Sequence, residues 1–192
     1  MMLPDELISS WSNSDIKPTE GSCSRVQIDY FRAFLEKNTS VKTILEIGFN
    51  GGLSSAAFLS ARSDIHVVSI DLGEHDYVLR AKQWIDKEFP DRHMLFIGNS
   101  LMAFPQLLQM FPSFSPDLIF IDGGHDAPVP ASDLTYALEL ARLDTWICID
   151  DTVEWMIDIM SAINTAVNQE RMAILDKQRD DIHGWVICKK IG

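Results

Sequence analysis

Short apolar runs alternate with helix-compatible stretches along most of the chain, and each apolar run ends in polar residues. The runs predict five strands, over Thr43–Gly48, His66–Leu72, His93–Gly98, Leu118–Asp122 and Thr145–Asp150. Helical spacing of apolar residues predicts helices over Leu53–Arg62, Val78–Phe89, Ser100–Phe111 and Ala131–Arg142. Strands that alternate with helices are typical of an α/β fold, with a mostly parallel sheet and helices on both faces.

The two ends of the chain extend this pattern. Residues 1–21 read as an N-terminal arm or lid, or a short helix and a loop, and Ser22–Lys37 as an amphipathic helix. After a further helix over Trp155–Glu170, the runs Met172–Asp176 and Gly184–Lys189 predict a strand pair that could be antiparallel. The chain shows no linker or repeat, so residues 1–192 are expected to form one domain, with its core over residues 22–190.

The first predicted strand leads into a glycine-rich turn, with Gly48, Gly51 and Gly52 before the next helix. Glycines permit positive φ angles and let a ligand approach the backbone, and a helix that starts after such a turn favours nucleotides. A dinucleotide fingerprint counted from Gly48 would need glycines at positions 50 and 53, which are Asn50 and Leu53. No G-K-[ST] follows either, so the usual dinucleotide and P-loop motifs are both excluded.

Polar residues stand at the carboxyl ends of all five predicted strands, where ligands bind in open α/β sheets. They are Glu46 and Gly48, Asp71, Asn99 and Ser100, Asp122 with His125 after it, and Asp150 with Asp151. A single carboxylate of this kind can also cap a helix or form a turn. Polar groups at all five ends, against apolar strand bodies, favour a binding site. Asp71 lies 23 positions after Gly48, where an acidic residue would bind ribose hydroxyls.

Five segments together resemble class I S-adenosylmethionine-dependent methyltransferases, of the small bacterial type related to the catechol-type O-methyltransferases. They read I-L-E-I-G-F-N-G-G, V-V-S-I-D, F-I-G-N-S, D-L-I-F-I-D-G-G-H-D and I-C-I-D-D-T. The family's first motif is usually E/D-x-G-x-G-x-G; here Asn50 replaces the middle glycine, and asparagine tolerates left-handed backbone. The resemblance implies a Rossmann-like methyltransferase fold, with a seven-stranded sheet and an antiparallel last strand.

The resemblance also implies roles for the strand-end residues. Glu46, Gly48, Asn50 and Gly52 would line the methionine and ribose end of S-adenosylmethionine, Asp71 the ribose, Asn99 and Ser100 the adenine, and Asp122 would follow strand four. Catechol-type relatives hold a divalent cation such as Mg²⁺ on residues that correspond to Asp122, Asp150 and Asp151, through hard oxygen ligands. His125 is then a candidate general base beside Asp122, where the family commonly has a lysine. Alternatively, Asp150 and Asp151 only cap the next helix, and Asp122 starts a tight turn.

Composition and net charge limit the classes of molecule that the protein is expected to bind. The formal net charge of −12 disfavours nucleic acids and anionic membranes and favours a small-molecule acceptor. Three separated cysteines indicate free thiols in a reducing compartment, and no secretory signal opens the chain, so a cytoplasmic protein is expected. Trp11, Trp155 and Met156 could line the acceptor pocket, and family habit implies a homodimer through the N-terminal segment.

The interpretation is therefore a methyltransferase that acts on an oxygen of a small molecule, by in-line attack on the methyl group. Two other functions stay open at this point. One is a hydroxylase-like enzyme of the same fold, which would use its metal for oxygen chemistry. The other is a non-catalytic nucleoside-binding module.

Overall fold

A computed structural model describes residues 2–14, 16–19 and 23–192, and a seven-stranded sheet runs through this part of the chain. The strands are β1 (Thr43–Ile47), β2 (His66–Asp71), β3 (His93–Ile97), β4 (Leu118–Ile121), β5 (Trp146–Ile149), β6 (Met172–Arg179) and β7 (Gly184–Lys190). Their order across the sheet is β3-β2-β1-β4-β5-β7-β6, and β7 alone is antiparallel to its neighbours. The predicted α/β fold with an antiparallel last strand is confirmed.

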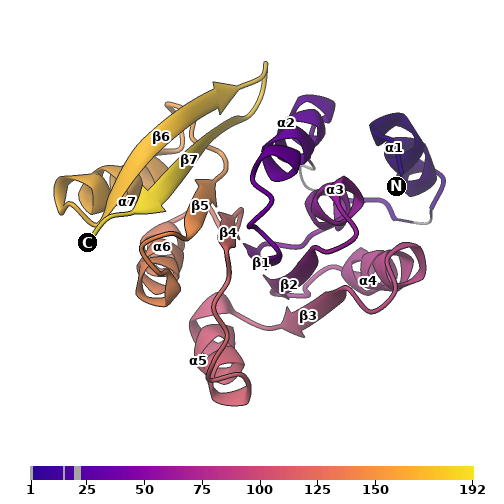
Figure 1. The fold of residues 1–192 in the computed structure, drawn as a ribbon, viewed down its shortest axis with the longest axis horizontal. Helices are drawn as coiled ribbons and strands as arrows, with labels where there is room; N and C mark the ends of the chain where they lie inside the picture. The colour runs from indigo at the N-terminus through magenta and orange to yellow at the C-terminus, as the bar shows by residue number, and fades with distance from the viewer. Residues whose placement is uncertain (1, 15, 20–22) are drawn as a thin grey trace.

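Helices cover both faces of this sheet. They are α1 (Pro4–Ser12), α2 (Arg25–Lys37), α3 (Leu53–Ala61), α4 (Asp76–Glu88), α5 (Ser100–Met110), α6 (Val129–Leu140) and α7 (Ile157–Asn168). Figure 1 shows α1 to α4 on one side of the sheet and α5 to α7 on the other, and each layer buries its own apolar cluster. None of the helices in the described ranges is both long and apolar enough to cross a membrane.

The central strands and α3 are the most deeply buried elements. All four residues of β4 and all nine of α3 are buried. The burial of β4 on both faces explains why it reads as a continuous apolar run. Small residues such as Ala56, Ala57 and Ser60 let α3 pack closely between α2 and the sheet. The core therefore fixes the carboxyl ends of β1 and β4, where the glycine turn and Asp122 follow.

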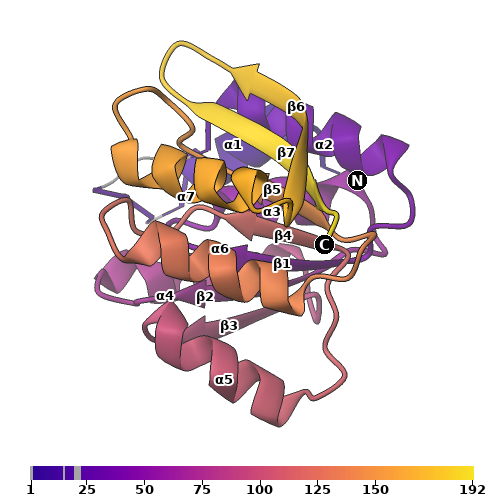
Figure 2. The same ribbon diagram turned by 90° about the vertical axis from the view of Figure 1, so that its left-hand side faces the viewer.

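Element ends differ from the predicted ones where tertiary contacts decide them. The predicted helix start at Ser22 lies outside the described residues, and α2 begins at Arg25 with Ser24 as its cap. The polar stretch expected to join the last two strands is shorter than predicted, because β6 continues to Arg179 and pairs there with Gly184. In Figure 2 this hairpin, the start of α6 and the loop before α7 lie along one side of the molecule.

Gly48 ends β1 in a position that only glycine can occupy. Its φ angle is +92°, and an added Cβ would lie 1.8 Å from the main-chain oxygen of Asp122. The Gly48 N–H donates to the Ile70 oxygen at 2.8 Å, and the Asp122 N–H donates to the Ile47 oxygen at 2.8 Å. The turn after β1 is therefore fixed directly against the loop after β4.

We expect Gly48→Ala to lower the free energy of unfolding by about 3 kcal/mol or more, because it combines backbone strain with a clash against backbone that cannot move away. Gly124→Ala is the matched control: its added Cβ would meet only the side chain of Val129, at 3.3 Å. We expect the control to cost less than about 1 kcal/mol. Urea unfolding of both variants measures the difference, and equal stabilities would contradict the close approach at Gly48.

Candidate functional site

The glycine turn after β1 is held by the carboxylate of Asp71. Its Oδ2 accepts hydrogen bonds from the N–H groups of Phe49, at 2.9 Å, and Asn50, at 2.8 Å, and its Oδ1 accepts from Gly73 at 2.8 Å. Asn50 takes the left-handed conformation that was expected of it, with φ +48°. Asp71 thus joins the ends of β1 and β2 and lies beside the turn, as its predicted role requires.

The N-terminal segment covers the outer side of the same turn. The indole N–H of Trp11 donates to the Gly51 oxygen at 2.8 Å, and a Cβ on Gly51 would meet Pro18 at 2.9 Å and Trp11 at 3.0 Å. This hydrogen bond holds α1 against the glycine turn. A place for Trp11 in an acceptor pocket stays a prediction.

Glu46 lies beneath the turn and has no exposed surface. Its carboxylate accepts hydrogen bonds from the hydroxyls of Ser54, at 2.6 Å, and of Ser55 and Ser69, both at 2.5 Å. Burial raises the pKa of Glu46 to about 7, although the three hydroxyls oppose this shift. Glu46 therefore fixes the first turn of α3 against β1 and β2, and it reaches a ligand only through the backbone above it.

The two residues after β3 that were predicted to lie near the adenine, Asn99 and Ser100, have different environments. The exposed Asn99 caps α5, since its Oδ1 accepts from the Leu101 N–H at 2.9 Å. Ser100 is buried and donates to Asp133 at 2.5 Å, and burial raises the pKa of Asp133 to about 6. The structure thus directs Ser100 toward α6, while Asn99 stays at the strand end.

Three exposed apolar side chains that the sequence analysis did not select lie at or just after the ends of β2 and β3. Leu72 directly follows β2, Ile97 ends β3 and Met102 lies in the first turn of α5; they are 53%, 52% and 65% exposed. Gly73 packs directly on Ile97, because a Cβ there would lie 2.7 Å from Ile97 Cγ2. Exposed apolar residues next to a polar cap form a surface suited to a planar base. Of the three, only Leu72 left a local signal in the sequence, as an apolar residue that directly follows the acidic end of β2.

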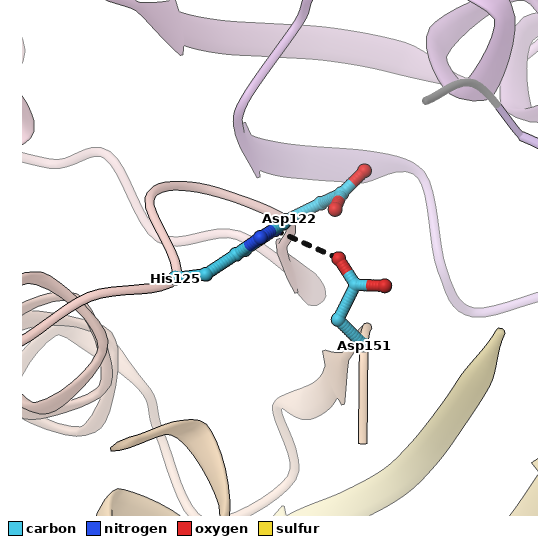
Figure 3. A group of neighbouring side chains, drawn as sticks. All are labelled: Asp122, His125 and Asp151. Carbon is cyan, nitrogen blue, oxygen red and sulfur yellow. Dashed lines mark ion pairs between the residues drawn. The ribbon is translucent and has the colours of Figure 1, made fainter. Parts of the chain in front are cut away.

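The loops after β4 and β5 bring Asp122, His125 and Asp151 together, as Figure 3 shows. One ligand atom of each lies within 4.8 Å of the other two, and His125 Nε2 lies 2.8 Å from Asp151 Oδ2. Asp151 takes a left-handed φ of +53°, and the His125 side chain is 44% exposed. We call these three residues the Asp–His–Asp cluster.

Asp150 does not belong to this cluster, although it was predicted to share a metal with Asp122 and Asp151. Its side chain accepts from the Gln27 amide, at 3.0 Å to Oδ1 and 2.7 Å to Oδ2, and Oδ1 also accepts from the Asp151 N–H at 2.9 Å. Asp150 is only 6% exposed. Gln27 thus turns the Asp150 carboxylate toward α2, and the metal site of Asp122, Asp150 and Asp151 stays a prediction.

Electrostatics in this region are governed by burial and by repulsion between carboxylates. Burial and the charges of Asp150 and Asp151 raise the pKa of Asp122 well above its usual range, and burial together with Asp151 raises that of Asp150 to about 7. The hydrogen bond to Asp151 raises the pKa of His125. No described residue makes a hydrogen bond to the Asp122 carboxylate, so a positively charged ligand would find an uncompensated partner there.

The β6–β7 hairpin closes another side of the site with residues that sequence reasoning missed. Asp180 accepts from Ser24 Oγ at 2.6 Å and lies 3.2 Å from His183 Nδ1. The Thr152 N–H donates to the Gly184 oxygen at 2.7 Å, which holds the hairpin against the loop after β5. These residues lie far from the glycine turn in sequence and follow no motif, so only the folded chain reveals them.

Comparison with known proteins fits this geometry. A sequence family described as "Methyltransferase domain" matches residues 45–152, more than half of the chain and the part that carries the glycine turn and the Asp–His–Asp cluster. No curated protein matches the chain by sequence.

Solved structures share the fold at low sequence identity. An O-methyltransferase from Bacillus cereus, in complex with SAH, is 19% identical with a TM-score of 0.77, over 98% of this chain and 90% of its own. A SAH-bound methyltransferase from Podospora anserina is 19% identical with a TM-score of 0.76, over 100% and 90%. The O-methyltransferase TomG from Streptomyces achromogenes, in complex with SAM, is 17% identical with a TM-score of 0.74, over 98% and 88%.

The solved structures show a common fold, as their TM-scores indicate. The family match covers more than half of the chain and shows membership of the family. The predicted class I methyltransferase fold is thereby confirmed. The chain belongs to the methyltransferase-domain family.

Proposed function

We propose that the protein transfers a methyl group from S-adenosylmethionine to an oxygen atom of a small molecule. The observation that carries this proposal is the glycine turn after β1. Asp71 fixes this turn through hydrogen bonds to the Phe49 and Asn50 N–H groups, next to the loop after β4 that carries Asp122. The names of similar structures add support, since they include O-methyltransferases in complex with SAH or SAM. A small-molecule acceptor, a cytoplasmic location and a homodimer stay predictions.

The proposed cofactor fits the described surfaces. Its adenine would lie on Leu72, Ile97 and Met102, with Asn99 at the edge, and its ribose hydroxyls would meet Asp71. A sulfonium cofactor is positively charged, and the carboxylate of Asp122 is the partner for that charge. The backbone of Gly48, Asn50 and Gly52 would lie under the methionine part, since all three residues take positive φ angles and the two glycines carry no side chain.

When bound, S-adenosylmethionine supplies a methyl group on a positively charged sulfur, which an oxygen nucleophile can attack in line. The chain's task is to hold the acceptor in line and to take its proton. His125 is the titratable side chain at the mouth of the Asp–His–Asp cluster, and Asp151 orients its ring through Nε2. His125 would take the acceptor's proton while the acceptor oxygen gains the methyl group, and the cofactor would leave as S-adenosylhomocysteine with the electrons of the broken carbon–sulfur bond on its sulfur.

We expect Asp71→Ala to weaken binding of S-adenosylhomocysteine by about 1–3 kcal/mol, because it removes the ribose partner and leaves two backbone N–H groups of the turn unpaired. Asp144→Ala is the control, since Asp144 is an exposed carboxylate just before β5, at the opposite edge of the sheet. Calorimetric titration measures both variants. Unchanged affinity in Asp71→Ala would remove the basis for the proposed cofactor pocket.

We expect His125→Ala to lower the methyl-transfer rate by about 10²–10⁴-fold while S-adenosylhomocysteine still binds, because proton removal is lost and the cofactor pocket is not. His66→Ala is the control, an exposed histidine at the start of β2. Since the pKa of His125 is raised by Asp151, wild-type activity should rise with pH through a value above the ordinary 6.5. Rates measured by S-adenosylhomocysteine release that are equal in the two variants would exclude this role for His125.

A further inference from the structure

A chain of polar groups connects Glu46 to the edge strand of the sheet. Glu46, Ser69 and His93 lie on the adjacent strands β1, β2 and β3, which Figure 1 shows side by side. Ser69 Oγ lies 2.5 Å from Glu46 Oε2 and 2.9 Å from His93 Nε2, and Ser69 has no exposed surface. The next hydroxyl, that of Ser55, lies 3.4 Å from the same nitrogen. His93 is therefore joined to Glu46 mainly through Ser69.

The hydrogens of this chain of groups follow from the number that each group carries. An ionised carboxylate only accepts hydrogen bonds, so each of the three serine hydroxyls around Glu46 donates its single hydrogen to it. Their distances of 2.5 and 2.6 Å are those of hydroxyls that donate to a charged oxygen. Because the hydrogen of Ser69 is then used, its contact with His93 needs a hydrogen on Nε2.

The other nitrogen of the His93 ring agrees with this assignment. Burial lowers the pKa of His93 to about 3, the charge of Lys82 adds to this shift and that of Asp86 opposes it, so the ring is neutral and carries one hydrogen. Nδ1 is buried and has no hydrogen-bond partner in the part of the chain that the structure describes. Buried donors without a partner are rarer in proteins than acceptors with a free lone pair, which favours the hydrogen on Nε2.

Glu46 depends on all three of its hydroxyl donors to stay ionised. Burial raises its pKa to about 7, the three hydroxyls lower it, and the charge of Asp71 raises it. With the hydrogen on Nδ1 of His93, Ser69 would donate to Nε2 instead, and Glu46 would keep two donors. Loss of one donor favours the protonated carboxylate, which accepts weaker hydrogen bonds than the ionised one.

The His93 ring also packs against the residue that fills the glycine turn. Its centroid lies 4.9 Å from that of the Phe49 ring, with 30° between the planes. Phe49 is 1% exposed, and a Cβ added to Gly52 would lie 2.8 Å from Phe49 Cζ. The Phe49 N–H donates to Asp71. His93 thus reaches the turn by two routes, through its ring and Phe49 and through Nε2 and Ser69.

We propose that His93 is a positioning residue for the cofactor: its Nε2–H donates to Ser69, which leaves the Ser69 hydrogen for Glu46 and keeps that carboxylate ionised. The ionised carboxylate holds Ser54 and Ser55 in the first turn of α3, directly after the glycine turn. The backbone of the turn then keeps the shape that receives the cofactor. This inference rests on the proposed function and adds to it a residue of the edge strand that acts through others.

The first test is the position of the hydrogen in the wild-type chain. Nuclear magnetic resonance of the full chain with ¹⁵N-labelled histidine distinguishes a protonated from an unprotonated ring nitrogen, and the signals of His93 are those that His93→Gln lacks. At about pH 8, above the pKa of Glu46, we expect the hydrogen on Nε2. The ring should stay neutral down to about pH 5. A hydrogen on Nδ1 at the higher pH, or a ring that becomes charged within this range, would overturn the inference.

Two amide variants at this position form a matched pair. The amide nitrogen of His93→Gln extends about as far as Nε2 and can donate to Ser69, whereas that of His93→Asn extends only about as far as Nδ1. We expect S-adenosylhomocysteine to bind His93→Gln within about threefold of wild type and His93→Asn about tenfold or more weakly. Calorimetric titration at about pH 8 measures both. Equal affinities in the two variants would contradict a role for the donor at Nε2.

The same pair in a Ser69→Ala background shows whether the effect passes through Ser69. Without the serine hydroxyl, the two amide variants should bind S-adenosylhomocysteine within about threefold of each other, because the group that responds to the donor is gone. A difference of about tenfold that persists in this background would overturn the inference.

Titration of the wild-type chain separates this inference from the proposed function. If S-adenosylhomocysteine binds to the wild type and the two amide variants do not differ, the role of His93 is wrong and the methyltransferase proposal stands. If the wild type does not bind it, both proposals are overturned.

Discussion

Repulsion between carboxylates at the carboxyl edge of the sheet is the constraint that shapes this site. Burial raises the pKa of Glu46, Asp122 and Asp150, and the charge of Asp151 raises the pKa of Asp122 and Asp150 further. Each of three has its own compensation: serine hydroxyls for Glu46, a glutamine amide for Asp150, and the imidazole of His125 for Asp151. Asp122 has none among the described residues, which makes it the point where an external positive charge is most favourable.

The compensating groups also hold the backbone that forms the site. The serines on Glu46 belong to α3 and β2, so that one buried carboxylate fixes the start of the helix after the glycine turn. Gln27 ties the first turn of α2 to the end of β5, and Ser24 ties it to Asp180 in the β6–β7 hairpin. The polar groups of the site therefore hold separate segments of the chain in place relative to one another, in addition to any role toward a ligand.

Sequence reasoning reached the strand positions, the glycine turn and the acidic strand ends because these follow from local patterns. Buried parallel strands leave apolar runs, and Gly48 and Asn50 mark a turn with positive φ angles. The pattern could not determine where a strand-end side chain points. Asp150 turns to α2 and Ser100 to α6 because partners more than thirty positions away satisfy them. The hydrogen-bond partner of Trp11 is likewise distant in sequence, since it is the backbone oxygen of Gly51.

Burial of these carboxylates has a thermodynamic consequence that links ligand binding to stability. Burial raises the pKa of Glu46 and Asp150 to about 7, so between roughly pH 4 and 7 the folded chain keeps protons that the unfolded chain has released. The free energy of unfolding therefore falls as the pH rises through this range, and the deficit is greatest at neutral pH. A cationic ligand beside Asp122 removes part of that deficit, because it stabilises the ionised carboxylates of the folded state alone. The same buried carboxylates that lower the free energy of unfolding at neutral pH therefore make the binding of a sulfonium cofactor or a divalent cation more favourable.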